Sequence, residues 1–448
     1  MTPEVFKKRR QSLMSNMRDR GGGVAVLFTA PEVPRNRDAD FPFRWDSYFY
    51  YLTGFPEPEA ALVMVVSDSA EKSYLFCREK NDLREIWDGF RYGPAAAADI
   101  FGFDEAAPIH TINEALPKLL ADTPAIYYGL GIDPGMDLKV QHWLQAVRAQ
   151  ARAGITTPSQ ALDVRALIDE MRLIKDESEI ATMRQAAQIS AAAHVRAMQT
   201  TRPGQFEYEV EAELLYVFKK GGSQFPAYGS IVAAGVNACC LHYRENNQKM
   251  QGGDLLLIDA GCELNGYASD ITRTFPVNGK FSGAQKAIYE IVLASQEAAV
   301  FATKPGMRFI DPHLAAVRVL TQGLIDCKLI EGPLEDAIEQ QRYTRFYMHR
   351  TGHWLGMDVH DCGEYREPPL PGQKLASGVE KPWRILKPGM MLTVEPGLYI
   401  SPAADIAKEF HGIGIRIEDD ALVTTTGCEL ISSDVPKSVT AIEALMHH

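Results

Sequence analysis

Four acidic residues each border a strongly apolar run, where a charged side chain is unexpected. They are Asp259, Asp270, Glu395 and Glu418, beside the runs 255–258, 271–275, 391–394 and 415–417. A buried carboxylate must be paired, neutralised or bound to a metal, because burying an isolated charge costs a large amount of free energy. Any one of the four alone would be read as a surface residue at a strand end. Together they favour a shared site.

Convergence of these four side chains would require a strong positive charge. Carboxylates crowded together raise one another's pKa, so only nearby cations hold all of them ionised. Two divalent cations would balance four carboxylates in formal charge. The acidic set therefore predicts a metal site.

A group of histidines supplies the candidate nitrogen ligand. His349, His353 and His360 fall within a dozen positions and are interspersed with glycines. A lone histidine is usually structural, which is our interpretation of His110, His142 and His411. Three so close together indicate a functional site instead.

The elements that must position these residues follow from hydrophobic periodicity. Strands are predicted at 254–260, 271–277, 390–394 and 414–419, separated by helical stretches such as 284–303. Asp176 followed by Glu179 resembles a capping box, so a long helix is expected to begin there. This part of the chain reads as α+β with antiparallel strands.

The first part of the chain has a different pattern. Short apolar runs at 24–28, 61–66 and 73–76 alternate with helical stretches, which is typical of a mixed α/β domain. A turn-like segment near 156–159 marks the transition. We therefore predict two domains, 1–165 and 166–448. We read the long segment 364–382 as a loop, and we assign no role to His447 and His448.

Composition limits the class of protein. At 448 residues the chain exceeds the length of a single core, and no apolar segment is long enough for a membrane helix. The net charge of -12 argues against a nucleic-acid binder. Seven scattered cysteines fit a reducing compartment, so we expect a cytoplasmic protein. The basic segment 5–17 is interpreted as a surface helix rather than a transit peptide.

The ordered acids and histidine also carry a resemblance. Together with the motifs IDAG, DITRTFPV, HWLGMDVHD, TVEPGLYI and GIRIEDD, they resemble the M24 or pita-bread metallopeptidases, and most of all aminopeptidase P. The similarity extends to YYLTGFPEPEA at 50–60 and MRLIKDESEI at 171–180. It implies an α/β creatinase-like N-terminal domain followed by an α+β pita-bread catalytic domain.

The resemblance implies the metal ligands and the reaction. Asp259 would chelate one metal, Asp270 and Glu418 would bridge two, and His353 with Glu395 would complete the second. The ions would be two divalent metals, manganese by family likeness, although cobalt, zinc and iron are not excluded by this oxygen-rich set. A metal-bridging hydroxide would hydrolyse the N-terminal Xaa-Pro bond, with Glu395 moving the proton.

Further site residues are expected from the same resemblance. The catalytic candidates are His242, His349, His360, Glu395 and Arg416, with His360 stabilising the oxyanion and Arg416 supporting the bridging carboxylates. The substrate-binding candidates are Asp38, Trp87, Arg152 and Tyr228, the first three at an entrance that a neighbouring subunit helps to form. A homo-oligomer, either a tetramer or a dimer, is expected.

Two alternatives remain open at this point. A prolidase, which cleaves Xaa-Pro dipeptides, would use the same five ligands. A non-catalytic pita-bread module that binds peptides would have lost ligands, whereas this chain has all five. Methionine aminopeptidase is disfavoured because it does not need the first domain.

Overall fold

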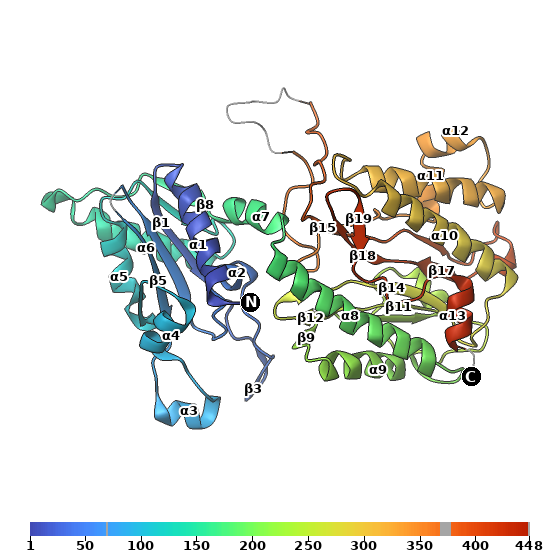
Figure 1. Ribbon diagram of the computed structural model, residues 1–448, viewed down its shortest axis with the longest axis horizontal. Coiled ribbons are helices and arrows are strands. Elements are labelled where there is room, and N and C mark those ends of the chain that lie inside the picture. The colour runs from blue at the N-terminus through green and yellow to red at the C-terminus, as the bar shows by residue number, and fades with distance from the viewer. Residues whose placement is uncertain (69, 368–377, 447–448) are drawn as a thin grey trace. The chain divides into compact units, whose positions relative to one another are not determined.

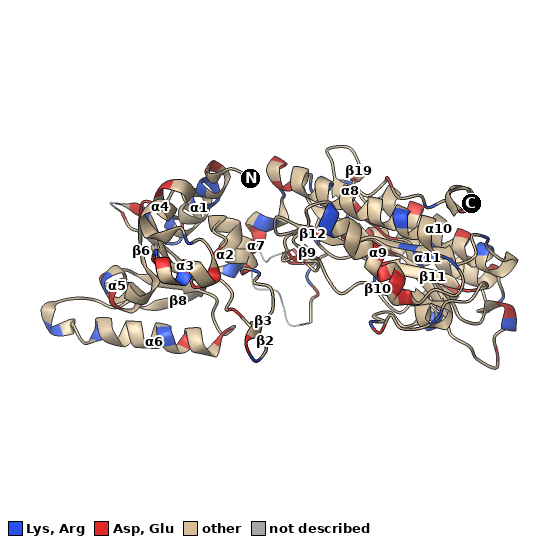
Figure 2. Ribbon diagram, turned by 90° about the horizontal axis from the view of Figure 1, so that it is seen from below, with Lys and Arg blue, Asp and Glu red and all other residues tan. Residues whose placement is uncertain are grey.

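The computed structural model describes residues 1–68, 70–367 and 378–446 (Figure 1). The chain divides into two compact units, Met1–Met171 and Arg172–His448. The division falls within helix α7 (Arg165–Leu173). Among the described residues, no helix combines the length and the apolar character needed to cross a membrane. Figure 2 shows acidic and basic positions mixed along the helices of both units.

A six-stranded mixed sheet forms the centre of the first unit. Its order is β6 (Glu105–Pro108), β5 (Glu71–Cys77), β4 (Ala61–Val66), β1 (Gly23–Phe28), β7 (Ala125–Tyr128) and β8 (Gln160–Asp163). The pairs β1–β4 and β4–β5 are antiparallel, and the other three are parallel. The three strands predicted in this region are therefore confirmed.

Helices cover both faces of this sheet. They are α1 (Pro3–Arg18), α2 (Ser47–Thr53), α4 (Gly93–Phe101), α5 (Ile112–Leu120) and α6 (Pro134–Arg148). Helices α5 and α6 pack on the face that includes Val24 and Val63, while α1 and α2 contact β4 from the other side. A small helix α3 (Asp82–Asp88) and the hairpin β2 (Pro34–Asn36) and β3 (Ala39–Asp40) complete the unit.

Helix α1 differs from its sequence-based interpretation as a surface helix. Its basic residues Arg9 and Arg10 are buried, at 5% and 1% exposure. Arg10 donates to the carbonyl oxygen of Leu52 at 2.9 Å, and Arg9 donates to that of Tyr51 at 3.2 Å. Part of the basic segment therefore caps the end of α2 instead of facing solvent.

The second unit contains short antiparallel sheets. One sheet orders β10 (Ile231–Ala234), β11 (Leu255–Asp259) and β14 (Thr272–Pro276), and another orders β13 (Tyr267–Ala268), β12 (Cys262–Leu264) and β9 (Phe225–Pro226). A third orders β15 (Met391–Val394), β18 (Asp419–Val423) and β19 (Cys428–Leu430), and β16 (Gly397–Ile400) pairs with β17 (Ile413–Arg416). Each described pair is antiparallel, as predicted.

Two pairs of long helices pack beside these strands (Figure 1). They are α8 (Glu177–Thr200) with α9 (Glu207–Lys220), and α10 (Gly283–Ala302) with α11 (Asp311–Asp326). Helix α8 begins with the predicted capping box of Asp176 and Glu179. The shorter helices are α12 (Leu334–Glu339) and α13 (Val439–Met446), and 3-10 turns occur at Ile109–Thr111, Ala151–Ala153, Gly235–Cys239, Arg342–Arg345 and Lys408–Phe410.

The single strand predicted over 414–419 is wrong. Strand β17 ends at Arg416 and pairs with β16, whereas β18 begins at Asp419 and pairs with β15. The chain changes sheets between them, and the backbone N–H of Glu418 donates to the carbonyl of Thr272 at 3.0 Å. Periodicity within one segment does not reveal such a change of partner.

The predicted loop 364–382 lies partly outside the described residues. Its described flanks contain no helix, and Arg366 pairs with Trp383 in an isolated bridge. His447 and His448 also lie outside the described residues.

Candidate metal centre

Asp259 and Asp270 meet because two paired strands carry them. Asp259 ends β11 and lies opposite Thr272 of β14, and Asp270 stands just before that strand. The hydroxyl of Tyr228 is 2.6 Å from Asp259 Oδ1 and also within hydrogen-bonding reach of Asp270 Oδ1. The antiparallel register therefore places both carboxyl groups side by side.

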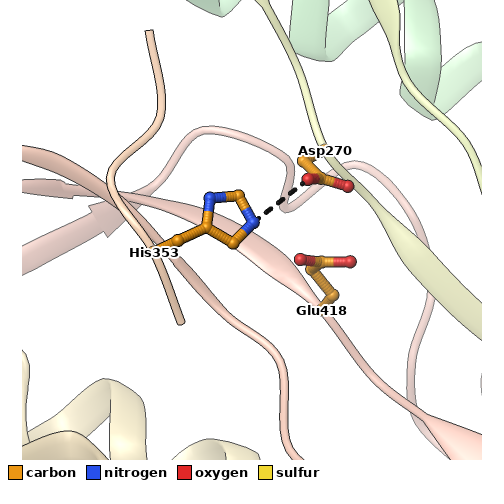
Figure 3. Close-up of side chains that lie close together, drawn as sticks. All are labelled: Asp270, His353 and Glu418. Atoms are coloured by element: carbon orange, nitrogen blue, oxygen red, sulfur yellow. Dashed lines mark ion pairs between the residues drawn. The ribbon is translucent and has the colours of Figure 1, made fainter. Parts of the chain in front are cut away.

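His353, Glu395 and Glu418 approach from the other strands. His353 Nε2 lies 3.4 Å from Asp270 Oδ2 and 3.8 Å from Glu395 Oε1. One potential ligand atom each from Asp270, His353 and Glu418 lies within 4.8 Å of the other two (Figure 3). Glu395 follows β15, whose residue Thr393 donates its N–H to the carbonyl of His353 at 3.0 Å.

The imidazole of His353 has a defined orientation. Its Nδ1 lies 2.9 Å from the carbonyl oxygen of Trp354, and a carbonyl only accepts, so Nδ1 is the donor. The other nitrogen, Nε2, then faces the carboxyl groups. This is the arrangement by which proteins fix the tautomer of a metal-binding histidine.

Arg416 ties the cluster to the surrounding side chains. It donates through Nη2 to Asp259 Oδ2 at 2.6 Å, and through Nε to the hydroxyl of Thr272 at 3.1 Å. Thr272 in turn donates to Glu418 Oε2 at 2.6 Å. One arginine thus links two of the candidate ligands.

A hydrogen-bond chain continues from Arg416 to His349. Arg416 Nη1 donates to the Tyr399 hydroxyl at 2.9 Å, and that hydroxyl lies 2.8 Å from His349 Nε2. His349 Nδ1 donates to the carbonyl of Arg350 at 2.7 Å, so its Nε2 accepts from Tyr399. Burial, followed by the charge of Arg416, lowers the pKa of His349 to about 4 and keeps it neutral.

The protein's own cations do not balance the acidic cluster. Burial, reinforced by Asp270 and Glu395, raises the pKa of Glu418 well above its ordinary value. Burial also raises the pKa of Asp270 and of Glu395. Burial lowers the pKa of His353, but Asp270 and Glu395 outweigh it and raise that pKa to about 9. Four carboxyl groups and one imidazole gathered in this way fit a site for hard divalent metal ions.

The cluster opens into a cavity of about 840 Å³. Besides the five candidate ligands, its lining includes Tyr228, His242, His349, His360 and Arg416. The ring of His360 stacks on that of His353 with centroids 3.9 Å apart. Partial burial, followed by the charge of His353, lowers the pKa of His360 to about 4. A peptide bound here would meet both the metal-binding groups and several potential hydrogen-bond donors.

Three of the expected residues belong to the first unit. Asp38 lies at the turn between β2 and β3 with a positive φ of 64°, and Trp87 on α3 is 84% exposed. Arg152 is exposed in a 3-10 turn. Their expected part in substrate entry stays a prediction.

Sequence reasoning missed several groups that contact the cluster. Tyr399 and Thr272 lie inside the quoted motifs, but motif matching gave them no role. Asp420 is buried, and both of its carboxyl oxygens lie 3.2 Å from the backbone nitrogen of Asp270. The run of three acids at 418–420 beside an apolar strand was the available signal.

Comparison with known proteins gives consistent similarities across the chain. Residues 181–425 match metallopeptidase family M24, and residues 6–127 match the N-terminal domain of aminopeptidase P. The chain is 45% identical to an Escherichia coli Xaa-Pro aminopeptidase, over 99% of this chain and 97% of that protein. It is 32% identical to human Xaa-Pro aminopeptidase 3, over 98% of this chain and 85% of that protein.

Solved structures show the same architecture. The Pseudomonas aeruginosa aminopeptidase PepP matches with a TM-score of 0.94 and 49% identity, over 100% of this chain and 98% of that one. A zinc-substituted E. coli aminopeptidase P in complex with product also matches with a TM-score of 0.94, at 44% identity and the same coverage. These similarities confirm the predicted fold class, an α/β first domain and an α+β pita-bread catalytic domain.

Proposed function

This chain belongs to metallopeptidase family M24, and on that premise we propose that it releases the first residue from peptides whose second residue is proline. The observation that carries this proposal is the cluster of four carboxyl groups and one imidazole that lines the cavity. Relatives that match almost the whole chain are named Xaa-Pro aminopeptidases. Loss of ligands, expected of a binding module, is not observed.

The site uses divalent metal, and we propose two ions, both manganese. Asp259, Asp270, His353, Glu395 and Glu418 would hold them. When bound, such ions lower the pKa of a water molecule and polarise the scissile carbonyl. The predominance of oxygen donors supports manganese, because soft metals prefer sulfur ligands.

The side chains around the ligands would handle the proton and the developing charge. Glu395, in the cavity lining, would take a proton from the attacking water and pass it toward the proline nitrogen, which leaves as a secondary amine. His360, stacked on His353, would donate a hydrogen bond to the oxygen of the scissile carbonyl. Arg416 and the Tyr399–His349 pair would hold Asp259 in place.

The guanidinium of Arg416 is not available to capture the carboxylate of a dipeptide. A dipeptidase needs a cation to capture the proline carboxylate. Arg416 is buried in the cavity wall, and its guanidinium already donates to Asp259, Thr272 and Tyr399. Arg416, one of four arginines in the cavity lining, is therefore engaged with the protein itself.

We further propose that the chain forms a homo-oligomer, a tetramer or a dimer. Helix α3 and the second residue after it expose large apolar side chains, namely Leu83, Ile86, Trp87 and Phe90, each at least 65% exposed. Such a patch is typical of a protein interface. Asp38, Trp87 and Arg152 would then help to form the entrance for substrate, and Tyr228 would contribute from within the cavity.

We propose a cytoplasmic location for the enzyme. The structure describes all seven cysteines and joins no two of them by a disulfide, and burial raises the pKa of the Cys77 thiol to about 12 and that of Cys239 to about 11. Such thiols fit a reducing compartment, where structural disulfides are rare.

Release of free arginine from Arg-Pro-Pro, Arg-Pro and Arg-Ala-Pro, with manganese present, tests the proposed specificity. We expect kcat/KM for Arg-Pro-Pro to exceed that for Arg-Pro by at least about tenfold, roughly 1.4 kcal/mol. Arg-Ala-Pro should be much poorer. Preference for Arg-Pro would indicate a prolidase, and equal cleavage of Arg-Ala-Pro would remove the proline specificity.

A further inference from the structure

The segment that carries His242 into the cavity contains little regular structure. It runs from the end of β10 through a 3-10 turn at Gly235–Cys239 to residue 248. Leu241, His242 and Arg244 of this segment line the cavity. Strand β10 is antiparallel to β11, so its first residue Ile231 lies opposite Asp259 and its last residue Ala234 lies opposite Leu256. The segment therefore starts at the end of β10 away from Asp259 and comes back to the cavity at residues 241–244. A few backbone hydrogen bonds, such as that from the Glu207 N–H to the carbonyl of Gln248 at 3.1 Å, hold it together with side-chain contacts.

Glu207 supplies four of these contacts. It is the first residue of α9 and is completely buried, at 0% exposure. Its Oε1 accepts from the Ala234 N–H at 2.8 Å and from Asn237 Nδ2 at 3.0 Å. Its Oε2 accepts from the Tyr243 hydroxyl at 2.8 Å and from the Gln248 N–H at 2.9 Å.

All four donors belong to residues 234–248, two before His242 and two after it. The carboxylate thus holds the segment on both sides of the histidine, and Tyr243 is the residue directly after it. A buried carboxylate pays its desolvation cost only if its oxygens are hydrogen-bonded, so the side chain and the segment depend on each other. Asn246 adds a second connection by donating to the carbonyl of Ser230 at 2.9 Å.

We propose that Glu207 is a positioning residue that sets the place of His242 in the cavity. The inference rests on the proposed function, because it assigns His242 to contact with the bound peptide. Glu207 itself is buried behind the segment and is absent from the cavity lining. It therefore acts through His242 and not on the substrate.

Glu207→Gln is the direct test, because it keeps the shape of the side chain but replaces one acceptor oxygen with an NH₂ group. Two of the four donors would then face another donor. With Arg-Pro-Pro and manganese, we expect kcat/KM to fall by about 10- to 100-fold, the usual effect of losing a group that orients a site residue. Metal content, measured by elemental analysis, should stay at the wild-type value, since the segment supplies none of the proposed ligands.

A double-mutant cycle separates positioning from general destabilisation. His242→Ala should lower kcat/KM to a similar extent, and the double variant Glu207→Gln, His242→Ala should lie within about threefold of His242→Ala alone. Glu213→Gln is the matched control, because Glu213 is on the same helix but pairs with Arg196 of α8. We expect it to stay within about twofold of wild type, on the scale of an exposed ion pair.

Several results would overturn the inference. Wild-type kcat/KM in Glu207→Gln, or losses that multiply in the double variant, would show that Glu207 does not act through His242. If Glu207→Gln does not fold, Tyr243→Phe removes one of the four donors and can replace it in the double-mutant cycle with His242→Ala.

If even the wild type does not cleave Arg-Pro-Pro, the proposed function fails, and hydrogen exchange then tests the positioning of the segment by Glu207. The backbone amides of 235–248 should exchange faster in Glu207→Gln than in the wild type. In Glu213→Gln their exchange rates should equal those of the wild type.

Discussion

Glu418 and Asp419 are neighbours in the chain, both almost fully buried, yet their carboxyl groups lie in opposite electrostatic surroundings. Glu418 faces Asp270, Glu395 and Asp259, and burial together with those acids raises its pKa well above the ordinary value. For Asp419, burial raises the pKa, but Arg273 and Lys437 outweigh it and lower the pKa. Two adjacent acids therefore belong to two different kinds of region.

The region around Asp419 satisfies its own charge. Asp419 accepts from Arg273 at 2.7 Å, from Lys437 at 2.9 Å, from Gln296 at 2.9 Å and from Ser432 at 2.7 Å. Every one of these partners is a side chain of the second unit. The charge of Asp419 is therefore neutralised by side chains of the protein, without a bound metal ion.

A third region follows the Asp419 pattern. Asp361, directly after His360, pairs with Arg172 at 2.6 Å and with Lys175 at 2.8 Å, and all three side chains are 1% exposed. Burial raises the pKa of Asp361, but Lys175 and Arg172 lower it overall. Asp419 and Asp361, which have their own cations, are thus structural, whereas the crowded acids around Glu418 lack enough cations and mark the metal site.

Removal of metal should produce the largest effect, because the Glu418 region, unlike those of Asp419 and Asp361, lacks enough cations of its own. Chelation is expected to lower turnover of Arg-Pro-Pro by at least about 10³-fold, roughly 4 kcal/mol, and Mn²⁺ should restore it best. The metal-free protein should stay folded but melt at a lower temperature, since ligands that bind only the native state stabilise it. Full activity in a preparation shown by elemental analysis to lack metal would contradict the metal site.

Asp419→Asn should cost about 3 to 5 kcal/mol of unfolding free energy, the usual effect of removing one partner from a buried ion pair. The guanidinium of Arg273 would remain charged and buried, but it would lose the carboxylate that now neutralises it. Denaturant unfolding of the metal-free protein measures the loss. A change below about 1 kcal/mol would mean that Asp419 behaves like an exposed ion-pair partner and would break the comparison.

Glu395→Gln should lower turnover by about 10² or more, near 2.7 kcal/mol, because the amide cannot relay a proton. The unfolding free energy of the metal-free variant should not fall, since Glu395 belongs to the region with excess negative charge. Steady-state kinetics and metal analysis on one sample are the measurement. Unchanged turnover at normal metal content would remove Glu395 from the mechanism.

Glu418→Gln should give the smallest and most diagnostic effect. In metal-free protein, we expect the unfolding free energy to rise by about 1 kcal/mol, the scale of a one-unit pKa shift, because one of several crowded acids is removed. The amide oxygen can still accept from Thr272. The same variant should bind manganese more weakly. If Glu418→Gln lowered the unfolding free energy as much as Asp419→Asn, Glu418 would stabilise the fold as Asp419 does, and the comparison would fail.

Much of the architecture was predictable from local patterns. The apolar run 61–66 became β4 with the same bounds, and the Asp176 capping box starts α8 as expected. Both rest on interactions within a few residues, which the sequence displays directly. The order of the acids and histidine inside their motifs was specific enough to indicate the family. These properties were determined by the sequence alone.

The tertiary structure determined which buried acids lie in the metal site and which form ion pairs within the protein. Glu418 and Asp419 look alike in the run Glu418-Asp419-Asp420, and only the fold brings Asp270 to one and Arg273 to the other. In the same way, Tyr399 joins Arg416 to His349, and Glu207 holds the segment around His242. Hydrophobic spacing shows which side of one element is buried, but a pKa or a hydrogen bond depends on the other elements that pack against it.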